Sequence, residues 1–255
     1  MFVYLSIVFF IIGTIFGSFY NVVGYRVPKG ESLLYPSSHC TKCNHKLKPI
    51  ELIPILSFLL LGGKCSKCKQ KISWFYPIFE FLSGILFMLS FMMFGLTFNC
   101  LLSILFVSML LIIIVSDYQT MIIPDEVLIV FSVLILTVKY IIGSFNLVGI
   151  SLLNGLGSFV FMFLLKLLGD FIFKKESMGG GDIKLLGVYG IVLGFPLSIV
   201  SVFLAAIIGL PISLIFLKVK KSHEIPFGPF LAVSALILWF SRLDFNILIN
   251  ILSNL

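Results

Sequence analysis

Apolar runs about as long as a lipid bilayer is thick recur along this chain of 255 residues. A helix that spans a membrane needs about 20 consecutive apolar residues. Such runs occupy residues 1–24, 74–94, 98–116, 124–142, 148–173, 183–195, 196–218 and 228–252, of which 183–195 is the shortest. The sequence therefore predicts an all-α polytopic membrane protein with about eight transmembrane helices.

The composition excludes a soluble or a disordered chain. Hydrophobic residues make up 60% of the sequence, charged residues 11%, and the mean hydropathy is +1.17. Soluble domains are on average about 45–50% apolar and about 25% charged. A surface facing water has no room for this excess of Phe, Ile and Leu, and a disordered chain has far fewer apolar residues.

Basic residues predict the orientation of the first helices. Of the 18 Lys and Arg residues, nine lie in one loop: Arg26, Lys29, Lys42, Lys46, Lys48, Lys64, Lys67, Lys69 and Lys71. Because Lys and Arg accumulate on the cytoplasmic side, we expect this loop inside and the N-terminus outside. No nucleic-acid recognition motif accompanies the charges, so nucleic acid is not an expected partner. The predicted parts are a first transmembrane helix (1–24), a cytoplasmic loop (25–73) and a seven-helix membrane domain (74–255).

Four cysteines in this loop form two Cys-x-x-Cys pairs, separated by 21 residues: Cys40 and Cys43, then Cys65 and Cys68. Two such pairs complete a tetrahedral Zn²⁺ site, and four thiolates leave no open position, so the zinc would be structural. A cytosolic loop keeps its thiols reduced, which favours metal over the alternatives, a redox pair or disulfides. His39 and His45 flank the first pair and are not expected to be ligands.

Acidic residues in or beside the apolar runs are functional candidates, because a charge at the bilayer centre costs at least about 2.5–3.5 kcal/mol. Asp117 ends one predicted helix and Asp182 begins another, both at the cytoplasmic edge. Two carboxylates brought together there would share a proton, and the ionised one could activate a water, as in aspartic proteases. Asp125 and Asp170 lie on the same side, so topology alone does not select the pair.

The run Gly179-Gly180-Gly181 before Asp182 permits a close approach of backbone that other residues would block.

The alternative to an enzyme is a non-enzymatic membrane assembly factor, or an ion or proton transporter, with a zinc-stabilised docking loop. A transporter would need a polar path across the membrane, whereas these aspartates all lie on one predicted side. The acid distribution therefore favours an enzyme.

Several patches together resemble the type IV prepilin peptidase family, in family order and over nearly the whole chain. They are Phe16-Gly-Ser-Phe-Tyr-Asn-Val-Val-Gly-Tyr-Arg-Val-Pro28, the two Cys-x-x-Cys pairs, Tyr76-Pro-Ile-Phe-Glu80, Asp117-Tyr-Gln-Thr-Met-Ile-Ile-Pro-Asp125, Gly179-Gly-Gly-Asp-Ile-Lys184 and Ile225-Pro-Phe-Gly-Pro-Phe-Leu-Ala232.

The resemblance implies an eight-helix intramembrane aspartic protease of the GxGD class, with Asp117 and Asp182 as its catalytic pair and Asp125 as a helix-start residue. It implies removal of prepilin or pseudopilin leaders, after a Gly, at the cytoplasmic face of a bacterial inner membrane. Many members also N-methylate the new N-terminal residue with S-adenosylmethionine, whose binding residues the sequence does not assign. The matching residues Asn21, Glu80, Gly179, Gly181 and Lys184 would shape the active site or join helices.

Overall fold

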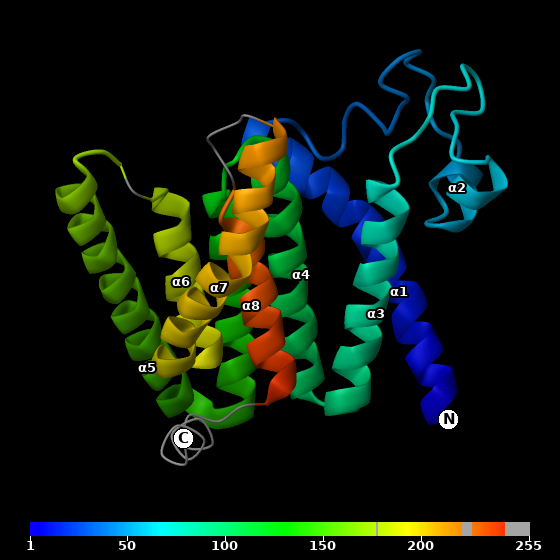
Figure 1. Ribbon diagram of the computed structural model, residues 1–255. Helices are drawn as coiled ribbons and strands as arrows, with labels where there is room; N and C mark the ends of the chain where they lie inside the picture. The colour runs from blue at the N-terminus through cyan, green and yellow to red at the C-terminus, as the bar shows by residue number, and fades with distance from the viewer. Residues whose placement is uncertain (177, 221–225, 243–255) are drawn as a thin grey trace. The chain divides into compact units, whose positions relative to one another are not determined.

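The computed structural model describes residues 1–176, 178–220 and 226–242, and the side chains of all of these except 216–220. The described part is helical and contains no β-strand (Figure 1). Its helices are α1 (Phe2–Arg26), α2 (Leu56–Leu60), α3 (Phe75–Phe94), α4 (Phe98–Thr120), α5 (Asp125–Phe173), α6 (Gly180–Leu193), α7 (Phe195–Lys220) and α8 (Gly228–Ser241), with two 3₁₀ turns, η1 (Val27–Lys29) and η2 (Pro49–Leu52).

The predicted fold class is confirmed. Among the described residues, five helices are long and apolar enough to cross a membrane, namely α1, α3, α4, α5 and α7. The 49 residues of α5 cover two predicted runs, and non-helical backbone at Gly143 and Ser144 divides them within the predicted break. The sixth run forms the short helix α6, as expected. The end of the eighth run, residues 243–252, lies outside the described residues.

The chain forms two compact units, Met1–Val115 and Ser116–Leu255, and the end of α4 passes from the first into the second. The first unit holds the four-cysteine loop, and the second holds Asp117 and Asp182. The division into a first helix, a loop and a seven-helix domain stays a prediction.

In the first unit, α1 packs along α3 (Figure 1). Stacked rings of Phe9 and Phe91, 4.7 Å apart, join one end of this pair. The hydroxyl of Tyr20 donates to Ser108 Oγ of α4 at 2.6 Å, so α1 is tied to α4 as well. Because both partners are buried, this hydrogen bond fixes α1 more firmly than apolar contacts alone would.

In the second unit, α6 packs against α5 and α7. Ser158 and Ser198 join α5 to α7 through their hydroxyls at 2.6 Å. Lys139, before the break in α5, donates from Nζ to Ser151 Oγ after the break and to the carbonyl of Ile191 near the end of α6. Lys139 therefore joins both halves of α5 to α6.

Candidate active site and metal centre

The two Cys-x-x-Cys segments fold into matching turns. The N–H of Asn44 donates to the carbonyl of Cys40 at 2.9 Å, and the N–H of Lys69 donates to the carbonyl of Cys65 at 3.1 Å. Asn44 and Lys69 both adopt left-handed backbone, with φ of +53° and +57°. Each turn therefore presents its two thiols on one side.

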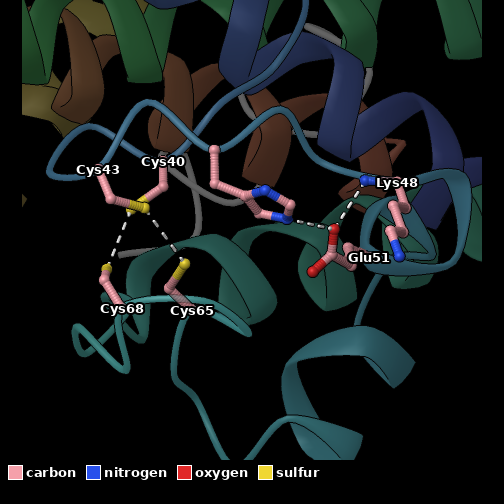
Figure 2. Close-up of polar contacts among 7 residues, drawn as sticks. Cys40, Cys43, Lys48, Glu51, Cys65 and Cys68 are labelled. Carbon is pink, nitrogen blue, oxygen red and sulfur yellow. Dashed lines mark hydrogen bonds and ion pairs between the residues drawn. The ribbon is translucent and has the colours of Figure 1, made fainter.

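The four Sγ atoms lie within 4.8 Å of one another, with Cys40 facing Cys68 at 3.7 Å and Cys43 facing Cys65 at 4.0 Å (Figure 2). Metal–sulfur bonds of about 2.3 Å in a tetrahedron separate the sulfurs by about 3.8 Å. The bonded distance in a disulfide is only about 2.0 Å. The predicted cysteine cluster is confirmed as one that can hold a metal ion, and all four thiols are free.

The first two thiols of the cluster differ in acidity. Hydrogen bonds from the N–H groups of Cys43 and Lys42 lower the pKa of the Cys40 thiol to about 6. The N–H of His45 lowers the pKa of the Cys43 thiol, but burial and the other three thiols together raise it to about 11. A lowered pKa favours the thiolate, which is the form that binds metals.

The two histidines beside the cluster make other contacts. His45 Nε2 lies 3.3 Å from Glu51 Oε2, which also accepts the N–H of Lys48 at 2.7 Å (Figure 2). The Lys48 N–H is the main reason why the pKa of Glu51 is below its usual value, with contributions from Ser66 and His45. His39 Nδ1 lies 2.9 Å from the carbonyl of Ser37. The imidazoles support the loop around the cluster.

Two predicted site residues, Asn21 and Glu80, belong to the first unit and are buried there. Asn21 Nδ2 donates to the carbonyl of Gly17 one turn earlier in α1, at 3.1 Å. Glu80 Oε2 in α3 accepts the N–H of Ile55 at 2.8 Å, which attaches the cysteine loop to this helix. The Asn21 contact lies within α1, whereas the Glu80 contact joins two segments of the first unit. A role of either residue in catalysis stays a prediction.

Asp117 lies in the last turn of α4 and is 6% exposed. Its Oδ2 accepts the backbone N–H of Gly228, the first residue of α8, at 2.8 Å. The N-terminus of a helix favours a negative charge, because free N–H groups and the helix dipole point toward it. A Cβ on residue 228 would lie only 2.6 Å from Oδ2, so any other residue there would displace the Asp117 carboxylate or the start of α8.

The sequence alone does not assign a role to Gly228. This glycine lies in the run Pro226-Phe-Gly-Pro229, which belongs to one of the patches that resemble the family. A glycine between prolines at the start of a helix indicates a tight backbone approach. Nothing in the sequence says that the approaching group is Asp117.

Asp182 lies in the first turn of α6, after Gly179 at the helix cap. Its carboxylate lies near enough to that of Asp117 for the two charges to interact. The buried Tyr189, two turns further along α6, is also within electrostatic range of Asp182. The second unit thus brings the two predicted catalytic aspartates together.

The glycines before Asp182 have different surroundings. A Cβ on Gly181 would lie 2.8 Å from Cβ of Ile123, in the turn between α4 and α5, whereas a Cβ on Gly180 would meet nothing within 4 Å. The hydroxyl of Ser116 donates to the carbonyl of Ile122 and holds this turn beside Asp117. Gly181 therefore lets the start of α6 approach the end of α4.

Lys184 forms an ion pair with Asp125, with Nζ at 2.6 and 2.8 Å from the two carboxylate oxygens. Asp125 is the first residue of α5, as expected for a helix-start acid, but its partner was not predicted. The pair joins the starts of α5 and α6, and both side chains are about half exposed.

Asp170 is the other aspartate that the predicted topology allowed as a catalytic residue. It lies in the last turns of α5.

These helices, with two interacting aspartates in one unit and four clustered thiols in the other, define a polytopic membrane protein with two separate polar centres. A model described as the Bacterial Peptidase A24 N-terminal domain matches residues 11–94, and one described as the Type IV leader peptidase family matches residues 104–214.

The full-length comparisons agree. The prepilin leader peptidase/N-methyltransferase of Bacillus subtilis (strain 168) is 33% identical, over 90% of this chain and 92% of its own length. Proteins of the same name from Neisseria gonorrhoeae and Pseudomonas aeruginosa are each 31% identical, over 90% of this chain and 88% of their own length. The chain belongs to the Type IV leader peptidase family. No solved structure matches it.

Proposed function

We propose that the protein is an intramembrane aspartic endopeptidase that removes the leader peptides of type IV prepilins or pseudopilins. The observation that carries this proposal is that Asp117 and Asp182, from two separate family patches, lie in one compact unit and within electrostatic range of each other. The family and the names of the relatives supply the substrate class. They do not favour the alternative of a transporter or a non-enzymatic assembly factor.

In the proposed mechanism, one carboxylate takes a proton from water while the other, protonated, donates to the carbonyl oxygen of the scissile peptide. The water oxygen then bonds to the carbonyl carbon, and the C–N bond breaks when the leaving nitrogen receives a proton. We assign the first role to Asp117, because the N–H of Gly228 at Oδ2 supports a carboxylate there. Asp182 then acts as the acid.

The charge distribution supports a cytoplasmic location of the site. Nine Lys and Arg residues favour a cytoplasmic first loop, with the N-terminus outside. Asp117 ends α4 and Asp182 begins α6, so both would lie at the cytoplasmic edge of a bacterial inner membrane. There the leader of a membrane-anchored substrate leaves the bilayer.

The metal in the cysteine cluster is proposed to be Zn²⁺, because four thiolates at tetrahedral spacing are its typical structural ligands. Cys40, Cys43, Cys65 and Cys68 would hold it. With no open coordination position, the ion would fix the loop and take no part in peptide cleavage.

The relatives' names also include N-methyltransferase. We therefore propose that this protein methylates the new N-terminal residue, with S-adenosylmethionine as the methyl donor. We assign no residue to its binding, and the mechanism above does not depend on it.

The test uses purified full-length protein in detergent and a prepilin that carries its leader, with the products followed by intact mass. Asp117→Asn and Asp182→Asn should each abolish cleavage, whereas Glu126→Gln, a nearby acid at the start of α5, should retain it. Cleavage that survives in either aspartate variant would overturn the assignment of the pair. Added S-adenosylmethionine should increase the product mass by one methyl group in place of a hydrogen.

A further inference from the structure

The short helix α2 presents leucine side chains outward, although it lies in the most basic segment of the chain. Leu56, Leu59 and Leu60 are 57%, 60% and 80% exposed. Trp74, directly before α3, is also exposed, and its ring packs edge-on against Phe58 of α2 at 4.7 Å. We call Leu56, Leu59, Leu60 and Trp74 the α2 patch. Large apolar side chains exposed together on and beside one short helix indicate a surface that contacts something other than water.

A hydrogen bond fixes the level of α2 along α3. The N–H of Ile55, the residue before α2, donates to Oε2 of Glu80 at 2.8 Å. Glu80 lies five residues after Phe75, where α3 begins, which is about 8 Å along the helix at 1.5 Å per residue. The start of α2 therefore lies beside the first turns of a membrane span and not beyond its end (Figure 1).

The backbone around α2 suits a medium without water. N–H groups along the segment donate to carbonyl or carboxylate oxygens of the protein, including those of Ile55, Ser57, Leu59, Leu61, Gly62 and Gly63. Backbone groups left unpaired are costly in hydrocarbon, so internal pairing is what permits a turn to enter lipid.

Positive charge follows the apolar turn directly. Four exposed lysines lie between α2 and α3: Lys64, Lys67, Lys69 and Lys71. Segments that lie in the membrane interface combine an apolar face, buried about 5–10 Å into the boundary between headgroups and acyl chains, with basic residues that contact anionic lipids. Both parts of this pattern are present in and beside α2.

We propose that α2 is a membrane-anchoring turn, whose patch inserts among lipid acyl chains while the four lysines contact anionic phospholipid headgroups. The occupant of the patch is the bilayer that also surrounds α3. The four-cysteine loop is thereby held against the membrane surface. This inference does not depend on peptidase activity.

The test uses two single-tryptophan versions of the full-length protein in nanodiscs of phosphatidylethanolamine and phosphatidylglycerol. Both carry Trp74→Phe and Trp239→Phe, which remove the two native tryptophans. One adds Leu60→Trp, and the matched control adds Lys46→Trp, at an exposed position after the first Cys-x-x-Cys turn. Lipids brominated in their acyl chains quench tryptophan inside the membrane, and acrylamide quenches it from water.

Brominated lipid should quench Leu60→Trp at least about threefold more than Lys46→Trp, as expected for an interfacial apolar face, and acrylamide should show the reverse order. Equal quenching of the two reporters by brominated lipid would overturn the proposal. So would protection of Leu60→Trp from both quenchers, because a protein would then cover the patch. If Leu60→Trp lowers the melting temperature, Leu59→Trp serves as the reporter.

A second arm tests the lysines. Replacing phosphatidylglycerol by phosphatidylcholine should weaken the quenching of Leu60→Trp by brominated lipid. Substituting the four lysines by Gln should remove this dependence on lipid charge. Quenching that does not respond to phosphatidylglycerol in the unsubstituted loop would overturn the headgroup contact.

Discussion

Each half of the four-cysteine cluster closes within a few residues, whereas the aspartate site joins distant parts of the chain. Cys40 and Cys65 each begin a turn closed by its own backbone hydrogen bonds. Asp117 accepts the N–H of Gly228, 111 residues further along the chain.

This difference determines what each centre depends on. Four thiolates in this cluster would repel one another unless a cation lay between them. The aspartate site needs helices packed so closely that two backbone positions have no room for a Cβ. The loop should therefore be sensitive to metal, and the aspartate site to single methyl groups.

The largest expected effect is on the loop. Structural Zn²⁺ contributes about 10–16 kcal/mol of apparent binding free energy in small zinc domains. We expect Cys40→Ser to lose the metal, and residues 39–71 to lose amide-exchange protection, while α5 and α6 keep theirs. Metal analysis and hydrogen exchange measure this, with Cys100→Ser in α4, a cysteine outside the cluster, as the control. Equal loss of amide-exchange protection in both units would show that the metal does not act on the cysteine loop alone.

At the aspartate site, Gly228→Ala should have the largest effect of a single methyl group. Its Cβ would lie 2.6 Å from Asp117 Oδ2, and a displacement of about 1 Å at a reacting group costs roughly 100-fold in rate. We expect kcat for leader cleavage to fall by about that factor while KM changes little. An unchanged kcat would show that Asp117 does not need this hydrogen bond.

Gly181→Ala should act mainly on stability. The new Cβ would lie 2.8 Å from Cβ of Ile123, and overpacking of this kind costs about 1–3 kcal/mol. The melting temperature in detergent should therefore fall. Gly180→Ala is the matched control, because its Cβ meets nothing within 4 Å, and it should leave the melting temperature equal or higher. Equal losses in the two variants would contradict the packing argument.

The smallest expected effect is at the ion pair of Asp125 and Lys184. Half-exposed pairs contribute about 0.2–1 kcal/mol. Asp125→Asn and Lys184→Gln should each lower the free energy of unfolding by this amount, and the double variant by less than the sum. The exchanged pair, Asp125→Lys with Lys184→Asp, should recover part of the loss. Fully additive losses would show that the pair is not coupled.

The sequence predicted features that local residues determine. The ends of the predicted runs at residues 94 and 142 agree with the structure, which places non-helical backbone at Gly95 and Gly143. The cysteine cluster followed from the Cys-x-x-Cys spacing, because a tight turn suffices to orient two thiols.

Features set by tertiary packing were missed. The helix α2 has only five residues, too few for a periodic pattern in the sequence to reveal it. Its position depends on a tertiary contact, the hydrogen bond from the N–H of Ile55 to Glu80 of α3. The hydrogen bond from Gly228 and the ion pair of Lys184 depend on which helix ends meet. For the same reason, topology alone left several aspartates as candidates, and only the resemblance selected Asp117 and Asp182.

The dependence of Asp117 on α8 has a consequence for biosynthesis. The ribosome makes Asp117 before half of the chain is complete, but the N–H that it accepts belongs to Gly228, in the last described helix. Asp182 is carried by α6, whose 14 residues reach about 21 Å, less than the roughly 30 Å of a bilayer's hydrocarbon core. A helix this short does not cross the hydrocarbon core on its own, and a chain that has not yet reached Gly228 lacks the N–H that Asp117 accepts in the folded protein.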